Sequence, residues 1–245
     1  NYPDRGQKTI SVMEMLRTTT KMRGVTEKTK DLVETLYIEL LDVLNSHFQH
    51  APYLLGESPC IGDFGLLAPL YGHLARDPHP AALMKKRAPR VYRWVERMNR
   101  ASQDAQEYFD CDTDFFQKNE VPETLIAVLR VLSQDFVPET VASAKCLNLW
   151  LSEQNPKTDS PAVFQLGTSP LGNVEFQVRD RLIKAAVVPY RHFQLQRIHQ
   201  IFDEVETKVQ MQIKQMLESC GMANLLNIRL NRLIGRRDNL EVWLD

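Results

Sequence analysis

The sequence contains none of the short motifs that mark the commonest catalytic and nucleotide-binding sites. No GxSxG string is present, so the nucleophile elbow of serine hydrolases is not indicated. GxGxxG and P-loop patterns are also missing, and the six histidines include no HExxH pair. We therefore assign no catalytic residue and no metal ligand from motifs.

The sequence also has few cysteines, no long apolar run and no excess of either charge. The four cysteines form no CxxC pair, a pattern typical of reduced thiols in a cytoplasmic protein. No apolar run is long enough for a membrane span. Thirty basic residues balance thirty-one acidic ones, so no chain-wide field attracts nucleic acid. We expect a cytoplasmic protein with neither a nucleic-acid nor a membrane partner.

Helical periodicity dominates the first half of the chain. Residues 10–22 are expected to form a helix that stops at Gly24, and apolar residues at three- and four-residue steps predict a helix over 32–48. A helix over 61–75 is expected to kink at Pro69 and to present Phe64 on its apolar stripe. The chain is then expected to break at 76–80 before a helix that begins at Pro89.

The acidic segment 102–121 is taken as a boundary between a domain of residues 1–107 and a further, mostly helical region of residues 108–245. In that region a helix from Pro122 is expected to be interrupted at Pro138. The runs 163–166 and 174–178 are the strand-like segments and predict one β-hairpin. Three further helices are predicted, over 180–202, 203–220 and 222–235.

Two groups of arginines in this region have alternative interpretations. The first group is an anion site or a set of surface ion pairs, and surface pairing is the commoner outcome. The second lies on the predicted terminal helix and either contacts an acidic partner or nucleic acid or is solvated. The first group is Arg179, Arg181, Arg191 and Arg197; the second is Arg229, Arg232, Arg236 and Arg237.

One stretch of the first half carries a family resemblance. Residues 54–64, LLGESPCIGDF, resemble the signature that leads into the central helix of glutathione S-transferase C-terminal domains. There an N-capping box begins the helix, and Asp63 takes the place of its acidic member. Cys60 stands where the family has Ser or Thr, which costs about 1 kcal/mol of helix stability. The order of 69–71, 76–78 and 89–98 is also similar to the family.

The resemblance implies a mainly α fold: a glutathione S-transferase C-terminal-like helical bundle, followed by the additional helical region with its β-hairpin. It also implies that the parent protein binds glutathione as co-substrate, conjugates or reduces a small electrophile, and forms a homodimer. In the family, glutathione is held mainly by a thioredoxin-like domain, which we expect before residue 1. The first helix of the C-terminal domain lines the electrophile pocket. The corresponding residues are Met13, Leu16, Arg17 and Thr20, and Arg17 would pair with an anionic substrate or a glutathione carboxylate.

Other interpretations remain open at this point. Helical domains of this fold also serve as non-catalytic protein-interaction modules, and a fold does not settle a function. A ligand-binding remnant with a degenerate partner domain is a third hypothesis. At the level of residues, Met13 and Leu16 are equally consistent with core positions, and Arg17 with a solvated charge.

Overall fold

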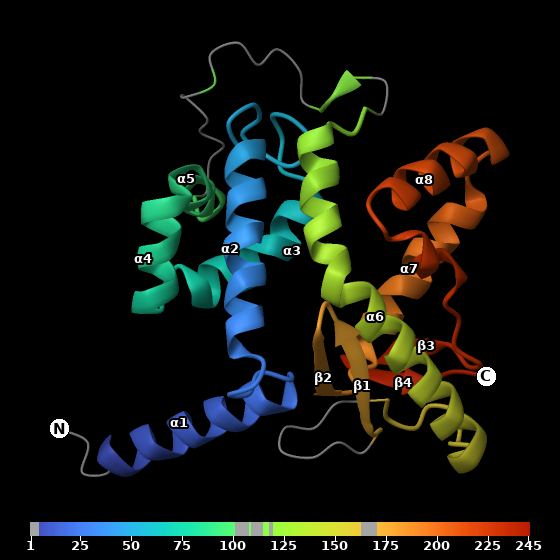
Figure 1. Cartoon of the computed structure of the whole chain (residues 1–245). Helices are drawn as coiled ribbons and strands as arrows, with labels where there is room; N and C mark the ends of the chain where they lie inside the picture. The colour runs from blue at the N-terminus through green and yellow to red at the C-terminus, as the bar shows by residue number, and fades with distance from the viewer. Residues whose placement is uncertain (1–4, 101–107, 109–114, 118–119, 163–170) are drawn as a thin grey trace. The chain divides into compact units, whose positions relative to one another are not determined.

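The computed structural model describes residues 5–100, 108, 115–117, 120–162 and 171–245 (Figure 1). The chain forms two compact units, one of residues 34–132 and one that joins residues 1–33 to residues 133–245. Helices α2 (Lys30–His47) and α6 (Glu123–Gln154) contribute to both. The described chain is mainly helical, as predicted. The predicted division into residues 1–107 and 108–245 describes segments of the sequence, not these spatial units, and it stays a prediction.

The unit of residues 34–132 has a core built on α5 (Pro89–Met98). Val91, Trp94 and Val95 are fully buried there, and the Trp94 ring stacks on Phe48 with centroids 5.2 Å apart. Burial of side chains of this size stabilises a fold by about 1.5–3 kcal/mol each. The predicted helices over 32–48 and from Pro89 are therefore confirmed, and their apolar faces form this core.

Asp63 lies at the start of the central helix α3 (Ile61–Pro69) and is fully buried. Its carboxylate accepts hydrogen bonds from the Leu54 N–H at 3.1 Å, the Cys60 N–H at 2.9 Å and the Trp94 indole N–H at 3.0 Å. A buried charge is tolerated only when such donors surround it. The prediction that Asp63 caps the start of this helix is confirmed, and the residue also ties α3 to α5. The expectation that the helix itself is buried is wrong, because Asp63 is the one buried residue of Ile61–Pro69.

Pro69 ends the α-helical part of this segment. The next five residues form the π-helix η1 (Leu70–Leu74), where the Ala75 N–H donates to the Leu70 carbonyl at 2.7 Å. Proline lacks the N–H that an α-helix needs, and a π turn is one known way to absorb the defect. The helix geometry thus changes at the predicted residue, and the kink itself stays a prediction. The place of Phe64 on the apolar stripe is wrong, because its side chain is 57% exposed.

The chain was expected to be non-helical over residues 76–80, and this is wrong for residues 78–80. Helix α4 (Pro78–Arg87) begins at Pro78, directly after Asp77 in an extended conformation. Proline suits the first helical position, whose N–H has no partner within a helix. The same reasoning had predicted the start of α5 at Pro89, so the two prolines start two consecutive helices.

Pro138 likewise does not interrupt its helix. Helix α6 runs through it for 32 residues, from Glu123 to Gln154. An internal proline costs a helix one hydrogen bond and some steric strain, but it does not have to end it. Burial of Val137 and Thr140 on either side shows that packing holds this part of the helix in place.

The other unit contains α1 (Arg5–Met22), which confirms the predicted first helix, and an antiparallel hairpin of β1 (Asn173–Val178) and β2 (Arg181–Ala186). The strand expected at 174–178 is confirmed, but its partner is β2. The predicted strand 163–166 lies outside the described residues. The helix predicted over 180–202 is wrong in its first part, since α7 (Tyr190–Glu204) begins only after β2.

Helix α8 (Thr207–Ser219) matches the prediction for 203–220, whereas the helix predicted for 222–235 is wrong. That segment contains the short 3-10 helix η3 (Ala223–Asn227) and enters β3 (Ile234–Arg237), which pairs with β4 (Leu240–Trp243). The Arg232 guanidinium donates to the Leu244 carbonyl at 2.8 Å and to the Pro156 carbonyl, and so ties the C-terminal end to the segment after α6.

Candidate functional site

Helix α1 supplies one side of a groove of about 730 Å³. Residues three, four and seven apart share a helix face, and Met13, Leu16, Arg17 and Thr20 follow that spacing. All four line the groove, together with Lys21 one step further. The structure therefore brings the four predicted site residues together, and their role in binding stays a prediction.

The predicted alternative that Met13 and Leu16 are core residues does not describe their surroundings. Their side chains are 45% and 47% exposed. Exposed apolar side chains that line a hollow are the usual composition of a small-molecule site. The Thr20 hydroxyl donates to the Leu16 carbonyl at 2.7 Å within α1, so its outward surface is mainly its methyl group.

The opposite side of the groove is the turn of residues 25–30, which follows α1. Thr29 fixes this turn: its hydroxyl donates to the Gly24 carbonyl at 2.6 Å and accepts from the Thr26 N–H at 2.9 Å. The Val25 N–H also donates a hydrogen bond to the Thr20 carbonyl at 3.1 Å. Thr29 is buried and these bonds are internal to the turn, so they hold the second side of the groove in place.

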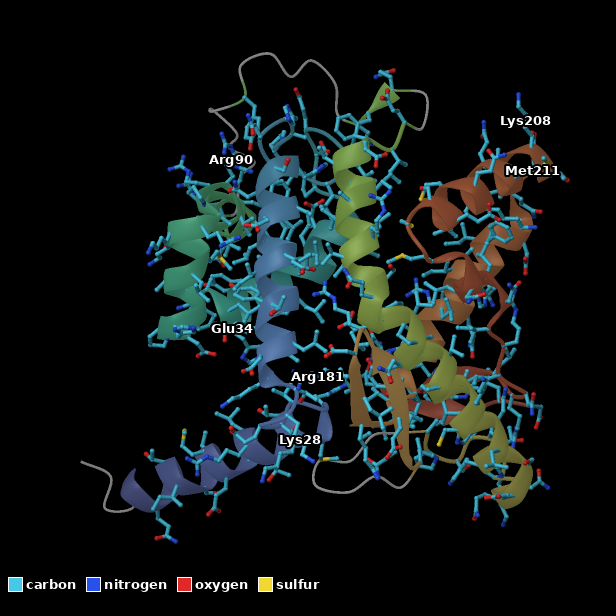
Figure 2. The ribbon with its side chains drawn as sticks, in the orientation of Figure 1. Lys28, Glu34, Arg90, Arg181, Lys208 and Met211 are labelled. Carbon is cyan, nitrogen blue, oxygen red and sulfur yellow. The ribbon has the colours of Figure 1, made fainter. Side chains whose placement is uncertain are left out.

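Gly24 makes this turn compatible with the hairpin behind it. Its φ of +84° favours glycine, and a Cβ at this position would lie 2.4 Å from the Ile183 Cγ2 of β2. Arg181 of the same strand donates to the Lys28 carbonyl at 2.8 Å, and Figure 2 shows the two residues side by side. The β1–β2 hairpin thus supports the groove from outside the first hundred residues.

The groove is unusually basic for a chain with balanced charge. Of the groove-lining residues that the structure describes, four are cationic and one is acidic: Arg17, Lys21, Lys28, Lys30 and Glu27. Glu27 and Lys30 form an ion pair at 2.7 Å, which lowers the pKa of Glu27 and raises that of Lys30. From the sequence we named Arg17 but none of the lysines. Lys21 follows Arg17 at helical spacing and was overlooked, whereas residues 25–30, which contain Lys28 and Lys30, carry no recognisable motif.

A second, much smaller cavity of about 30 Å³ lies beside α7. His192 is buried there with its Nε2 3.0 Å from the Ser143 hydroxyl, and burial lowers its pKa to about 4. His199 donates to the Leu225 carbonyl at 2.8 Å and also has a lowered pKa because of burial. These are hydrogen-bonded core histidines, and the cavity is too small for an organic ligand.

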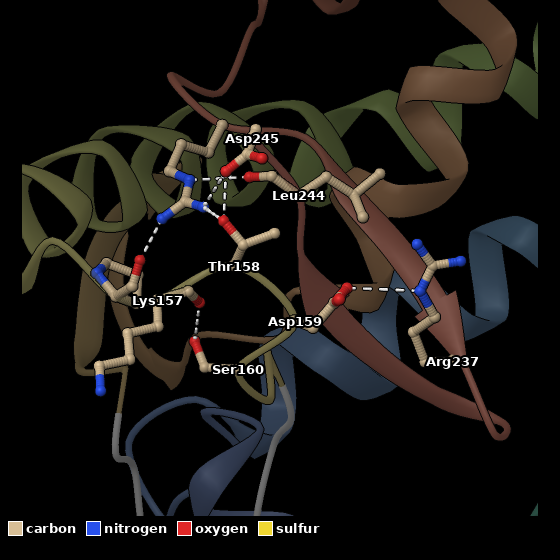
Figure 3. A network of polar contacts seen from close by, with 9 residues as sticks. Lys157, Thr158, Asp159, Ser160, Arg237, Leu244 and Asp245 are labelled. Carbon is tan, nitrogen blue, oxygen red and sulfur yellow. Dashed lines mark hydrogen bonds and ion pairs between the residues drawn. The ribbon is translucent and has the colours of Figure 1, made fainter.

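The arginines with two interpretations mostly have structural partners. Arg191 pairs with Glu139 at 2.6 Å, Arg179 donates to the Gln134 side-chain oxygen at 2.8 Å, and Arg197 reaches the Gln194 side-chain oxygen at 3.5 Å. The second group does not lie on a helix, which corrects that expectation. Arg236 pairs with Glu241 at 3.5 Å, and Arg237 pairs with Asp159 at 3.3 Å (Figure 3).

Among the residues that the structure describes, no cluster of three or more His, Cys, Asp and Glu side chains is arranged to hold a metal ion. In the described part of the chain, none of the helices combines the length and apolar character that membrane crossing requires.

Comparison with known proteins identifies the segment that carries the groove-forming helix. Residues 10–101 match the family model of the glutathione S-transferase C-terminal domain. The match confirms the predicted resemblance and extends from Ile10, within α1, through α5. No curated protein and no solved structure matches the chain.

Proposed function

We propose that this chain is the helical part of a glutathione S-transferase-like protein, whose parent binds glutathione and conjugates or reduces a small electrophile. In this proposal the groove between α1 and the turn of residues 25–30 holds the electrophile. The observation that carries the proposal is that four residues expected to contact the electrophile all line the same groove: Met13, Leu16, Arg17 and Thr20. Its volume of about 730 Å³ lies within the range of small-molecule sites.

The chemistry expected of the groove is positioning. In conjugation, the glutathione thiolate forms a bond from sulfur to an electrophilic carbon while the leaving group departs with the electron pair. No described residue of the groove lining is a Cys, His or Tyr that would activate the thiol. By resemblance, the residues that bind glutathione and lower its thiol pKa belong to a thioredoxin-like domain. Holding the electrophile against that thiolate converts a bimolecular encounter into an intramolecular step.

Two further parts of the proposal are the homodimer and the cytoplasmic location. Val12 and Met15 are exposed apolar residues of α1 that do not line the groove. Such residues are available for contact with a second protein surface. Sedimentation that shows a stable monomer over a wide concentration range would contradict the dimer, and cell fractionation tests the location.

The groove is tested most directly by calorimetric titration of the chain with S-hexylglutathione and with glutathione. We expect measurable binding of the S-hexyl compound through its alkyl chain, and weak or no binding of glutathione itself. Met13→Gln should weaken S-hexylglutathione binding about fivefold, because about 1 kcal/mol of apolar contact is lost.

Met15→Gln is the matched control. Met13 and Met15 lie on the same helix and are both 45% exposed, but only Met13 lines the groove. An equal loss in both variants, or tight binding of glutathione alone, would show that the site is misplaced.

A further inference from the structure

A basic surface lies in the unit of residues 34–132, at the junction of α4 and α5. Residues 85–93, KKRAPRVYR, contain five cations, and the sequence has no Asp or Glu between Asp77 and Glu96. All five cations are exposed. A chain whose net charge is −1 therefore concentrates one sign of charge in one short stretch, and such a stretch attracts ligands of the opposite sign.

The junction holds the two helix ends together. One buried residue, Ala88, separates α4 from α5. Its N–H donates to the Met84 carbonyl at 2.8 Å, and its carbonyl accepts a hydrogen bond from the Tyr92 N–H at 3.1 Å. The Lys85 ammonium of α4 lies 4.8 Å from the centroid of the Tyr92 ring of α5. The end of α4 and the start of α5 therefore form one adjoining surface.

The protein neutralises one of the cations itself. Arg87 forms a bidentate pair with Asp42 of α2, through hydrogen bonds of 2.7 Å and 2.8 Å. Among the described residues, Lys85, Lys86 and Arg90 form no ion pair. We call these three residues the junction patch, and Figure 2 labels Arg90 at the start of α5.

Helix stability accounts for the lysines of the patch but not for Arg90. Lys85 and Lys86 lie in the last turn of α4, where cations interact favourably with the helix dipole. Arg90 lies in the first turn of α5, where the dipole disfavours a cation and where no acidic residue is present. Its N–H donates to the neutral side chain of Asn45 at 3.0 Å, so this capping contact adds no negative charge. An acidic residue would suit this position of the helix better, whereas an anionic partner requires a cation.

The surroundings of the patch favour carboxylates as its ligands. The neighbouring pair of Arg87 and Asp42 shows a guanidinium of this surface binding a carboxylate with two N–H groups. Tyr92 is half-buried beside Lys85, and α4 and α5, which the structure describes in full, carry no large exposed apolar side chain. Base stacking by nucleic acids and insertion into a membrane both depend on such exposed groups.

We propose that the junction patch docks an acidic segment of a partner protein, whose carboxylates pair with Lys85, Lys86 and Arg90. Three cations within six positions of the chain match a run of three or more Asp and Glu residues. The inference goes beyond the proposed function, because none of the three residues is among those described as lining the groove.

The test is fluorescence anisotropy of the whole chain with a labelled peptide of alternating Asp and Glu, compared with the Asn and Gln peptide of the same length. We expect the acidic peptide to bind about tenfold more tightly at low salt, and less tightly once the screening length falls to about 8 Å. Lys86→Glu combined with Arg90→Glu should lower its affinity about tenfold. Lys145→Glu combined with Lys208→Glu makes a similar charge change on two exposed lysines of the other unit, and should have little effect.

Two further variants keep the inference open to refutation. Lys28→Glu alters the basic groove and should leave peptide affinity nearly unchanged; a larger loss than from the junction variant would place the peptide in the groove and overturn the inference. Arg90→Glu should unfold at the same or a higher urea concentration, because an acidic residue suits the first turn of a helix. A lower urea midpoint would show that Arg90 supports the fold, and would count against the inference.

Other anionic partners are separate outcomes of the same assay. Single-stranded oligouridylate and vesicles of phosphatidylcholine with phosphatidylserine should both bind more weakly than the acidic peptide at the same salt concentration. Tighter binding of either would overturn the choice of a protein partner. Equal affinity for the acidic and the neutral peptide, or an equal loss from the junction variant and the control variant, would overturn the patch itself.

Discussion

Replacement of Asp63 by Asn tests whether this carboxylate organises the helical core. Three N–H donors point at the two carboxylate oxygens, from Leu54, Cys60 and Trp94. Asn has nearly the same size, so the change creates no cavity. It does replace one acceptor oxygen by an NH₂ group, which must face at least one N–H donor in either orientation of the amide.

The expected cost follows from these contacts. A hydrogen bond to a charged group contributes about 1.5–3 kcal/mol, and the bonds that remain fall to neutral strength. Removal of the buried charge offsets part of this loss, because the charge no longer has to be desolvated. We expect Asp63→Asn to lower the free energy of unfolding by about 2–3 kcal/mol.

Urea unfolding monitored by circular dichroism measures this value, and hydrogen exchange of the Leu54 and Cys60 amides localises it. Asp42→Asn is the matched control, since Asp42 forms an exposed ion pair with Arg87 at 2.7 Å and such pairs contribute about 1 kcal/mol or less. If Asp63→Asn unfolds within about 0.5 kcal/mol of the native chain, or loses no more than Asp42→Asn, the role given to Asp63 is wrong.

Three other variants give independent checks by the same unfolding assay. Cys60→Ser restores a hydroxyl at the N-cap and should stabilise the chain by about 1 kcal/mol; no gain would contradict the capping argument. Gly24→Ala should destabilise it by more than 1 kcal/mol, since φ is +84° and the new Cβ meets Ile183, whereas Gly6→Ala in α1 meets nothing and should be neutral or stabilising. The pKa of His192 is lowered from 6.5 to about 4, so the unfolded chain binds the extra proton first. Stability should therefore fall by about 3 kcal/mol as pH drops from 6.5 to 4, and His192→Gln should lose that slope.

Much of the first hundred residues could be predicted because local signals agree with the final packing. Apolar periodicity located α2, and the box around Asp63 located the start of α3. Pro69 predicted a disturbance of the helix at the residue where the structure changes to a π-helix. The helix α4 was missed because Pro78 was treated as a breaker, although the N-terminal position of a helix suits proline. In this half the errors are the missed helix α4 and the exposed side chain of Phe64.

The second half failed where tertiary pairing overrides local preference. Residues 181–186, RLIKAA, are mostly good helix formers, yet they pair with β1 because Val174, Phe176 and Val178 present a buried face to the unit. The leucine spacing over 222–235 likewise favoured a helix. The overlooked signal was Asp238-Asn239: both residues have positive φ, of 47° and 64°, as hairpin turns of this kind require.

The groove shows why a site can be half predicted. Its helical side follows from residue spacing and family resemblance, both of which can be read along α1. Its other side depends on Thr29 holding the turn and on β2 packing against Gly24, and β2 comes from a segment more than 150 residues away. No local pattern announces that contact. The lysines of the turn line the groove because the hairpin packs against the turn beside α1. The α1 side of the groove, including Arg17 and Lys21, is therefore encoded locally, whereas the place of Lys28 and Lys30 depends on the fold of the whole unit.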